Sequence, residues 1–372
     1  MDRRAWLKRG GALGALSLFA APTLASSLTE REIREFRPRP LSNPVQLNFN
    51  ENPFGPSAKV RKAMTEAFDL GCRYPDDLIE ELAHMLSKKE GVTREHIVIG
   101  GGSSEGLKMT GATFAQGGGE IIAARPTFLA MMVFARQWGA TIKWVDLDES
   151  LTHDLDEMER RISAKTKLVF LCNPNNPTST IVDKNRLTDF CESASKKAIV
   201  FSDEAYYDFI EDPDYPSMIE LVKKGENVIV SRTFSKVFGL AGLRVGYLIA
   251  KPELANRIRE NMPANTNVLA LKAAMTALND QEFYDFSLNK VKEGKRLMYT
   301  TMDDLGLEYI KSQTNFIFFK TGRDITQFNS QMLAEGVRVG RPFPPYNDWC
   351  RISMGTIEEV QIFNKALVKV MS

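Results

Sequence analysis

The chain is poor in the residues that usually bind metal ions. It has four cysteines and three histidines, and no CxxC pair occurs. Zinc and iron–sulfur sites need thiolate or imidazole ligands at short, regular spacings. We therefore expect no metal site.

Charge of one sign and long apolar runs are lacking as well. Lys and Arg total 48 against 47 for Asp and Glu, so the protein has no overall field that would attract nucleic acid. No apolar run reaches the roughly 20 residues that a membrane-spanning helix needs. With 43% apolar and 26% charged residues, the composition is that of a soluble globular protein, and the length allows two domains.

The first 25 residues have the layout of an export signal. A basic start with the adjacent Arg3 and Arg4 precedes an apolar stretch at 11–21, and Ala25 is suited to peptidase cleavage. Residues 2–8 (DRRAWLK) are similar to the twin-arginine (Tat) pattern, which implies export of the folded protein by the Tat machinery and a periplasmic or other exported location. The alternatives are a basic amphipathic start and an uncleaved anchor. Export permits disulfides, but folding before export can keep buried thiols reduced, so both states of the cysteines stay open.

Short β-branched runs alternate with helical patterns in the first two thirds of the chain. We predict strands at 96–99, 120–123, 141–145, 167–172, 198–202, 228–230 and 245–249. Helical patterns lie between several of them, at 104–114, 127–138 and 184–195. This alternation predicts an α/β fold with a doubly wound, mostly parallel sheet that helices cover on both faces. Ligands of such sheets bind beyond the carboxyl ends of the strands.

The pattern changes after Pro263. A long helical stretch, two β-like runs and a final helix predict a smaller α+β domain; they lie at 266–305, 315–320, 350–354 and 358–371. The polar, proline-rich stretch before residue 47 reads as an arm that clasps the small domain or a partner subunit. The expected division is a signal at 1–25, an arm at 26–46, a large domain at 47–265 and a small domain at 266–372, linked by the long helix.

One lysine stands in a loop suited to reactive chemistry. Residues 231–246 (SRTFSKVFGLAGLRVG) follow an apolar strand and place Lys236 among small side chains. Burial beside small residues or another cation lowers the pKa of an amine, so that it becomes a nucleophile. Thr233, Ser235 and Arg244 could bind a phosphate nearby. Lysine and phosphate site together suggest pyridoxal phosphate, although a solvated surface loop is the alternative.

Three further motifs follow predicted strands. An asparagine in residues 173–178 (NPNNPT) can donate to a phenolate, and Asp203 in residues 203–206 (DEAY) can keep a pyridine nitrogen protonated. The turn at 100–106 (GGGSSEG) opens a helix and so forms an anion site. It lacks the spacings GxGxxG and GK[ST], which argues against nucleotides. Each motif alone could be an ordinary turn or strand end.

Taken in order, the motifs resemble the fold-type-I, pyridoxal-phosphate-dependent aminotransferases of class I and II, especially their histidinol-phosphate aminotransferase branch. The resemblance runs from about residue 47 to the C-terminus. The matching motifs are 50–53 (NENP), 73–75 (RYP), 102–106 (GSSEG), 126–128 (PTF), 173–178 (NPNNPT), 203–206 (DEAY), 231–246 and 351–356 (RISMGT).

The resemblance implies roles at matching positions. Lys236 would bind the cofactor as an imine and then act as the base that moves a proton at the substrate Cα. Asp203 would pair with the pyridine nitrogen, and Asn176 and Tyr206 would hydrogen-bond the ring oxygen. The other implied contacts are to the phosphate from Ser103, Ser104, Thr233, Ser235 and Arg244, to the ring from Phe128, and to the substrate carboxylate from Arg351. Tyr74 would reach the phosphate of the neighbouring subunit, which implies a homodimer with shared sites.

The sequence also departs from the family pattern. Ser179 stands where a glycine is usual after NPNNPT, and Met131 and Met132 follow Phe128 where an aromatic pair is common. An additional cation, Arg341, precedes Arg351 in the small domain. Our hypothesis is that Arg341 and Tyr346 shape substrate specificity.

The sequence thus predicts an aminotransferase that works by a ping-pong cycle between an amino acid, or a phosphorylated amino alcohol, and a 2-oxo acid. Decarboxylation, racemisation and elimination stay open, since they start from the same imine. A non-catalytic binding protein needs no reactive lysine, which argues against it. The resemblance suggests histidinol phosphate, whereas export would separate the protein from cytoplasmic histidine biosynthesis.

Overall fold

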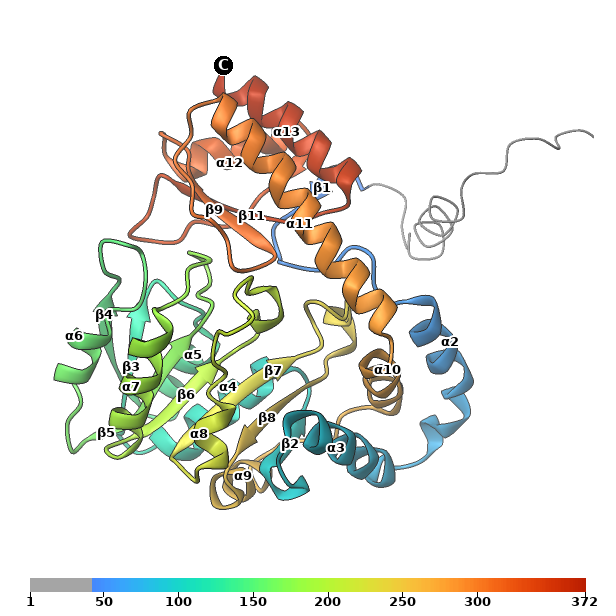
Figure 1. Ribbon diagram of the computed structural model, residues 1–372, viewed down its shortest axis with the longest axis vertical. Helices are drawn as coiled ribbons and strands as arrows, with labels where there is room; N and C mark the ends of the chain where they lie inside the picture. Colours follow the sequence, from blue (N-terminus) through green and yellow to red (C-terminus); the bar gives the residue numbers. More distant parts are fainter. Residues whose placement is uncertain (1–41) are drawn as a thin grey trace, which may run out of the picture.

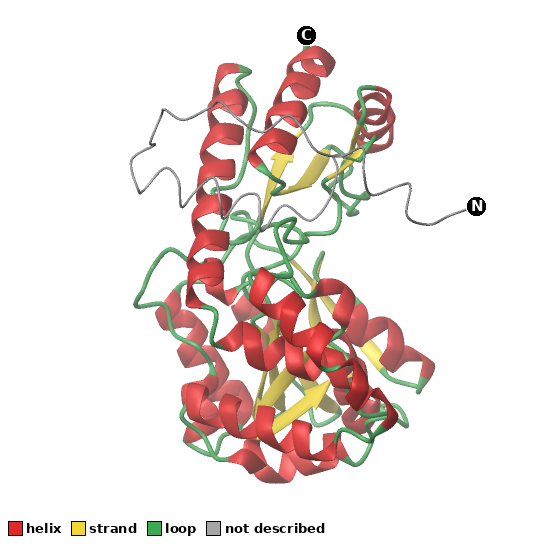
Figure 2. Ribbon diagram, turned by 90° about the vertical axis from the view of Figure 1, so that its right-hand side faces the viewer, coloured by secondary structure: helices red, strands yellow, loops and turns green. Residues whose placement is uncertain are grey.

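The computed structural model describes residues 42–372. The expected signal at 1–25 and all but the last residues of the expected arm lie outside this range. The described chain forms a large domain around a central sheet and a smaller domain above it (Figures 1 and 2). None of the helices within residues 42–372 combines the length and the apolar character that crossing a bilayer requires.

A seven-stranded sheet forms the centre of the large domain. Its strands are β2 (Ile97–Gly100), β3 (Glu120–Arg125), β4 (Thr141–Asp146), β5 (Thr166–Cys172), β6 (Ile199–Asp203), β7 (Val228–Thr233) and β8 (Gly246–Ala250). They lie in the order β2-β8-β7-β6-β5-β3-β4, and β8 runs antiparallel to both of its neighbours while the other pairs are parallel. All seven predicted strands are present, which confirms the predicted α/β fold.

Helices cover both faces of this sheet (Figure 2). They are α2 (Ala58–Glu66), α3 (Asp76–Glu90), α4 (Ser103–Ala115), α5 (Ala130–Gln137), α6 (Leu155–Arg160), α7 (Lys184–Ser195), α8 (Ile219–Lys223), α9 (Pro252–Arg259) and α10 (Val268–Leu278). Alternate residues of β5 belong to two separate cores: Val169 packs in one, and Leu168 and Phe170 pack in the other. A strand buried on both faces needs this continuous apolar sequence, because successive side chains point to opposite faces.

The small domain has its own core. It contains α11 (Gln281–Asp304), β9 (Phe316–Lys320), α12 (Ile325–Ala334), β10 (Val337–Arg338), β11 (Trp349–Ser353) and α13 (Ile357–Met371). Strands β9 and β11 pair antiparallel, and the short β1 (Val45–Gln46) pairs parallel with β10. Val45 and Leu47 are buried in the same core as Phe328 and Phe363. The last residues of the expected arm therefore pack on the small domain.

The helical stretch expected at 266–305 is two helices, α10 and α11. Asn279 ends α10, where its backbone N–H bonds to carbonyl groups of the last turn. Asp280 begins α11 with a side chain that is 2% exposed and lies 2.8 Å from the Lys59 ammonium group. The expectation of one helix was wrong because this ion pair with α2 fixes a break that periodicity does not show. The upper part of α11 then runs into the small domain (Figure 1).

The four cysteines are free thiols. Cys72 is exposed, and Cys172, Cys191 and Cys350 are buried. Burial raises the pKa of the Cys191 and Cys350 thiols, which makes them unreactive.

Candidate active site

A cavity of about 520 Å³ lies at the carboxyl ends of the central strands, between the two domains. Twelve of the side chains singled out from the sequence line it: Ser103, Ser104, Phe128, Asn176, Asp203, Tyr206, Thr233, Ser235, Lys236, Arg244, Arg341 and Arg351. Two others lie elsewhere. Tyr74 is 90% exposed, and Tyr346 packs edge to face on Phe318, with ring centroids 6.3 Å apart.

Lys236 follows β7 and points into this cavity. Its Nζ donates a hydrogen bond of 3.0 Å to the main-chain carbonyl of Asn50. Burial, and next the positive charge of Arg351, lower the pKa of Lys236 to about 8. Because the amine is then partly neutral near neutral pH, Lys236 can act as a nucleophile and later as a base.

The two neighbouring acids at the end of β6, Asp203 and Glu204, have different surroundings. Both carboxylate oxygens of Glu204 have partners. Arg232 Nη2 lies 2.8 Å from the carboxylate, and the Ser217 hydroxyl and the Met218 backbone N–H donate hydrogen bonds to it. Asp203 is 2% exposed, and its Oδ1 lacks a hydrogen-bond partner. Burial raises the pKa of Asp203 to about 7. A buried carboxylate oxygen without a partner is costly unless a bound group satisfies it, so Asp203 fits a cationic ring nitrogen.

A chain of hydrogen bonds joins the two domains across the cavity. Arg351 on β11 donates to Asn176 Oδ1 at 2.7 Å and to the Asn48 carbonyl at 2.6 Å. Asn176 Nδ2 in turn donates to the Tyr206 hydroxyl at 3.3 Å. Burial lowers the pKa of Arg351 to about 10, and its Nε has no partner. This leaves a charged guanidinium with free capacity for an anionic ligand.

The start of α4 and the loop after β7 form a cradle for an anion. Arg244 bonds to the Gly101 carbonyl at 3.3 Å and to Ser235 Oγ at 3.4 Å. Gly102, at φ 86°, precedes α4, and a Cβ there would lie 2.3 Å from Arg244 Nη2. Only glycine therefore lets the guanidinium approach the helix N-terminus, where Ser103 lines the cavity. Free N–H groups, hydroxyls and a guanidinium together suit a phosphate.

The comparisons with known proteins agree with this geometry. The family described as aminotransferase class I and II matches residues 42–367. The chain belongs to this family. It is 40% identical over 334 residues to a histidinol-phosphate aminotransferase of Moorella thermoacetica, covering 88% of this chain and 86% of the relative. It is 38% identical over 341 residues to histidinol-phosphate aminotransferase 1 of Bacillus cereus, covering 91% and 92%.

A solved structure has the same fold. It is the histidinol-phosphate aminotransferase of Sinorhizobium meliloti in complex with pyridoxal 5'-phosphate, with a TM-score of 0.82 at 24% identity and 95% of each chain covered. Among residues 42–372 of this aminotransferase, no group of three or more His, Cys, Asp or Glu side chains is placed to hold a metal ion.

Several cavity residues were not singled out from the sequence. They are Asn48, Phe49, Asn50, Glu51, Thr127, Ala205, Ala241, Arg338, Val339 and Phe343. Among them, Asn50 contacts Tyr206 through its side chain and Lys236 through its main-chain carbonyl. Asn50 belongs to one of the motifs that resemble the family (50–53), but the motif alone assigns it no role. Its hydrogen-bond partners Tyr206 and Ser353 lie 156 and 303 positions away, so sequence spacing does not predict these contacts.

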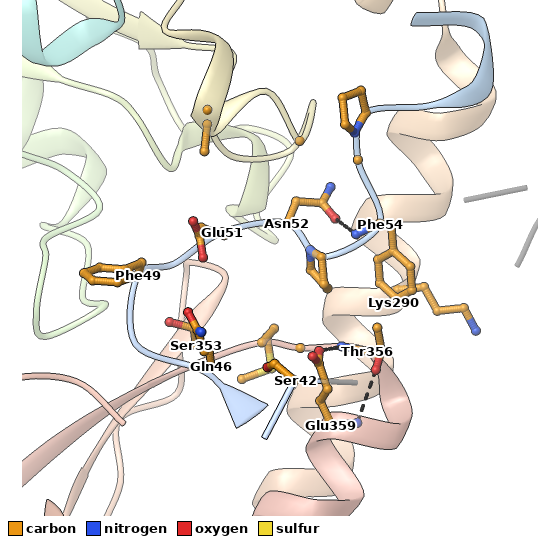
Figure 3. A pocket seen from close by; sticks show the side chains of 18 of the residues that line it. Ser42, Gln46, Phe49, Glu51, Asn52, Phe54, Lys290, Ser353, Thr356 and Glu359 are labelled. Atoms are coloured by element: carbon orange, nitrogen blue, oxygen red, sulfur yellow. Dashed lines mark hydrogen bonds between the residues drawn. The ribbon is translucent and has the colours of Figure 1, made fainter. Parts of the chain in front are cut away.

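A second cavity of about 510 Å³ adjoins the first and shares Phe49, Glu51 and Ala241 with it. Figure 3 shows it between the segment that leads to α2 and the start of α13, where Thr356 and Glu359 cap the helix reciprocally. The segment around Asn50 thus forms the wall between the two cavities.

Ser179 occupies a backbone conformation that favours glycine. Its φ is 61°, it is fully buried, and its Oγ has no partner. We expect Ser179→Gly to raise the free energy of unfolding by about 1 kcal/mol, because glycine relieves left-handed strain and removes a buried hydroxyl. Urea unfolding measures this change. Ser330→Gly in α12 is the control and should lower stability; a loss of stability in both variants would contradict the prediction.

Proposed function

We propose that this aminotransferase uses pyridoxal phosphate to move an amino group between an amino acid, or a phosphorylated amino alcohol, and a 2-oxo acid. The observation that carries the proposal is the pairing, in one cavity, of Lys236, whose pKa is lowered to about 8, with Asp203, whose buried Oδ1 lacks a partner. The relatives named as histidinol-phosphate aminotransferases support this activity.

The lining residues fit the cofactor at both of its ends. Asp203 would hold the ring nitrogen, and Asn176 and Tyr206 would donate to the ring oxygen. The phosphate would lie in the cradle formed by Ser103, Ser104, Thr233, Ser235 and Arg244, with Phe128 against the ring. When bound, pyridoxal phosphate supplies an electron sink for the bond broken at the substrate Cα. The Nζ of Lys236 would hold and return the proton of that carbon, and Arg351 would orient the substrate through its carboxylate or phosphate.

The purified protein provides a direct test. We expect the visible absorbance of bound pyridoxal phosphate, its loss when the right amine donor is added, and its return only when a 2-oxo acid follows. Return without any 2-oxo acid would indicate decarboxylation, racemisation or elimination instead. A wild-type protein that binds no cofactor would contradict the proposal.

Arg341 gives a prediction about specificity. It lines the cavity, and its guanidinium lies 4.3 Å from the centroid of the Phe343 ring, which Arg351 also approaches to 4.9 Å. We expect Arg341→Ala to raise KM about tenfold for substrates with a second anionic group, because a charge-assisted hydrogen bond is lost. Substrates with a neutral side chain serve as the control. An unchanged substrate profile would show that Arg341 has no role in specificity.

We further propose that two copies of the chain form a homodimer in which Tyr74 reaches the neighbouring site. In support, Tyr74 is 90% exposed and Phe68 is 64% exposed, which is unusual for aromatic side chains so close together in sequence. Sedimentation of the loaded protein should give a dimer. A monomer, or a Tyr74→Phe variant with unchanged affinity for the cofactor, would contradict this assignment.

Finally, we propose that the protein is exported by the Tat machinery to the periplasm or another exported location. The support is the Arg3-Arg4 pair followed by an apolar stretch, which lies outside the described residues. Residues 1–30 fused to a reporter that must fold before translocation should direct its export. The matched control, Arg3→Lys/Arg4→Lys, should block it; equal export of both fusions, or of neither, would contradict the proposal.

A further inference from the structure

Asn50 is bonded to the small domain through both its main chain and its side chain. It is 1% exposed and lies between β1 and α2 with φ 56°. Its backbone N–H donates to Ser353 Oγ at 2.8 Å, and the same hydroxyl donates to Asn50 Oδ1 at 2.9 Å. Because Ser353 already accepts from the backbone, its proton is free for Oδ1, and this fixes the orientation of the amide. Ser353 is two residues from Arg351 on β11, so both side chains lie on one face of that strand.

Asn50 also contacts the two reactive side chains of the large domain. Its Nδ2 donates to the Tyr206 hydroxyl at 3.0 Å, and its carbonyl accepts from Lys236 Nζ at 3.0 Å. Asn315 on the small domain donates to the same carbonyl at 3.1 Å. A single buried residue therefore joins β11, the phenol of Tyr206 and the amine of Lys236.

We propose that Asn50 is a positioning residue that couples the place of β11, and with it of Arg351, to the orientation of Tyr206 and Lys236. Asparagine suits this position for two reasons: it tolerates the left-handed conformation, and its amide has an acceptor for Ser353 and a donor for Tyr206. A hydrogen bond donated to the phenol oxygen also strengthens the bond that the phenol donates onward, because hydrogen bonds in series polarise one another. The proposal rests on the proposed function for two readouts: turnover requires the amino transfer, and the absorbance requires only the bound cofactor.

The test compares the loaded wild-type protein with Asn50→Gly. Glycine keeps the left-handed backbone and the main-chain carbonyl, but it removes both the oxygen and the NH₂ group of the side-chain amide. Of the two side-chain hydrogen bonds that this substitution removes, we expect the one to Tyr206 to affect turnover, with a fall in kcat of about five- to tenfold. The pH midpoint of the absorbance of bound pyridoxal phosphate should shift upward. When Tyr206 donates a weaker hydrogen bond to the ring oxygen of the cofactor, that oxygen keeps more negative charge. The charge lies beside the Lys236 nitrogen and favours the protonated form of that nitrogen, which raises the midpoint.

Two further variants decide whether Asn50 acts through Tyr206. Tyr206→Phe should shift the midpoint in the same direction, and the double variant Asn50→Gly/Tyr206→Phe should shift it no further than Tyr206→Phe alone. Ser353→Ala, which frees the amide but leaves its contact with Tyr206, should give a smaller shift of the same sign. An unchanged midpoint in Asn50→Gly, or additive shifts in the double variant, would overturn the proposal.

The control for a general loss of packing is Asn364→Ala. Asn364 on α13 donates to the Leu297 carbonyl at 3.0 Å and lines neither cavity, so this variant should alter the melting temperature and leave the midpoint in place. If Asn50→Gly does not fold, Ser353→Ala takes its place, and the double variant Ser353→Ala/Tyr206→Phe should then shift the midpoint no further than Tyr206→Phe alone. The midpoint is measured without turnover. A shift in a protein that transfers no amino group would therefore support the role of Asn50 while contradicting the proposed function.

Discussion

Lys236→Ala should abolish amino transfer, with kcat reduced by at least about 10⁴-fold. The substitution removes the amine that would bind the cofactor and would move the proton, and general acid–base catalysis alone contributes 10²–10⁴-fold. Single-turnover assays measure the loss. Borohydride treatment of the wild-type protein followed by peptide mass analysis should place the cofactor on Lys236.

A second buried lysine provides a matched control. Burial also lowers the pKa of Lys295 to about 8, but its Nζ donates to the Ser312 carbonyl at 2.7 Å and it lines neither cavity. Lys295→Met should therefore keep the absorbance of the bound cofactor and the turnover. The assignment of Lys236 would be contradicted if Lys236→Ala kept its turnover, or if borohydride fixed the cofactor on Lys295.

Asp203→Asn should lower kcat by about 10²–10³-fold. The amide keeps the shape of the side chain but removes the charge that would keep the ring nitrogen protonated, and breaking a buried ion pair costs about 3–5 kcal/mol. The control is the adjacent Glu204→Gln. Because Glu204 is bonded to Arg232 and Ser217 and does not line the cavity, this variant should lose stability but keep the cofactor's absorbance. Equal kcat losses in the two variants would contradict the distinction.

The cofactor-free protein gives an independent measure of Asp203. Burial raises its pKa to about 7, so the native state holds a proton that the unfolded state releases at about pH 4. The resulting stabilisation is present below about pH 4 and is lost as the pH rises to about 7. Urea unfolding across this range should show the decline in the wild type. Asp203→Asn should show a smaller one, and an equal decline in both would contradict the raised pKa.

The sequence predicts the large domain well because its central strands β5, β6 and β7 are buried on both faces. The short apolar runs in β5 and β7 favour buried strands over other secondary structure. Each reactive motif lies at or directly after the end of a strand. The carboxyl ends of those strands meet at one edge, so Lys236, Asp203 and Asn176 could be expected in one cavity before their distances were known.

The remainder depends on contacts that spacing does not encode. Strands β1 and β10 have two residues each, too few for a periodic signal. Tyr346 follows Arg341 closely in sequence, but a bridge between Phe343 and Tyr346 turns the chain back; Phe343 lines the cavity and Tyr346 packs on Phe318 instead. Asn50 depends on tertiary packing alone, since its partners come from distant segments.

Within residues 42–372, the chain passes between the domains twice: through the segment from β1 to α2, and along α11. Two domains that are joined by two chain connections can rotate relative to each other about the line through both connections. A sliding movement would instead stretch one of the connections. We therefore expect movement of the small domain to be mainly a rotation about this line. Groups near such an axis travel least, and Asn50 lies in one of the two connections, so we expect its bonds to Ser353 and Tyr206 to persist during such a rotation.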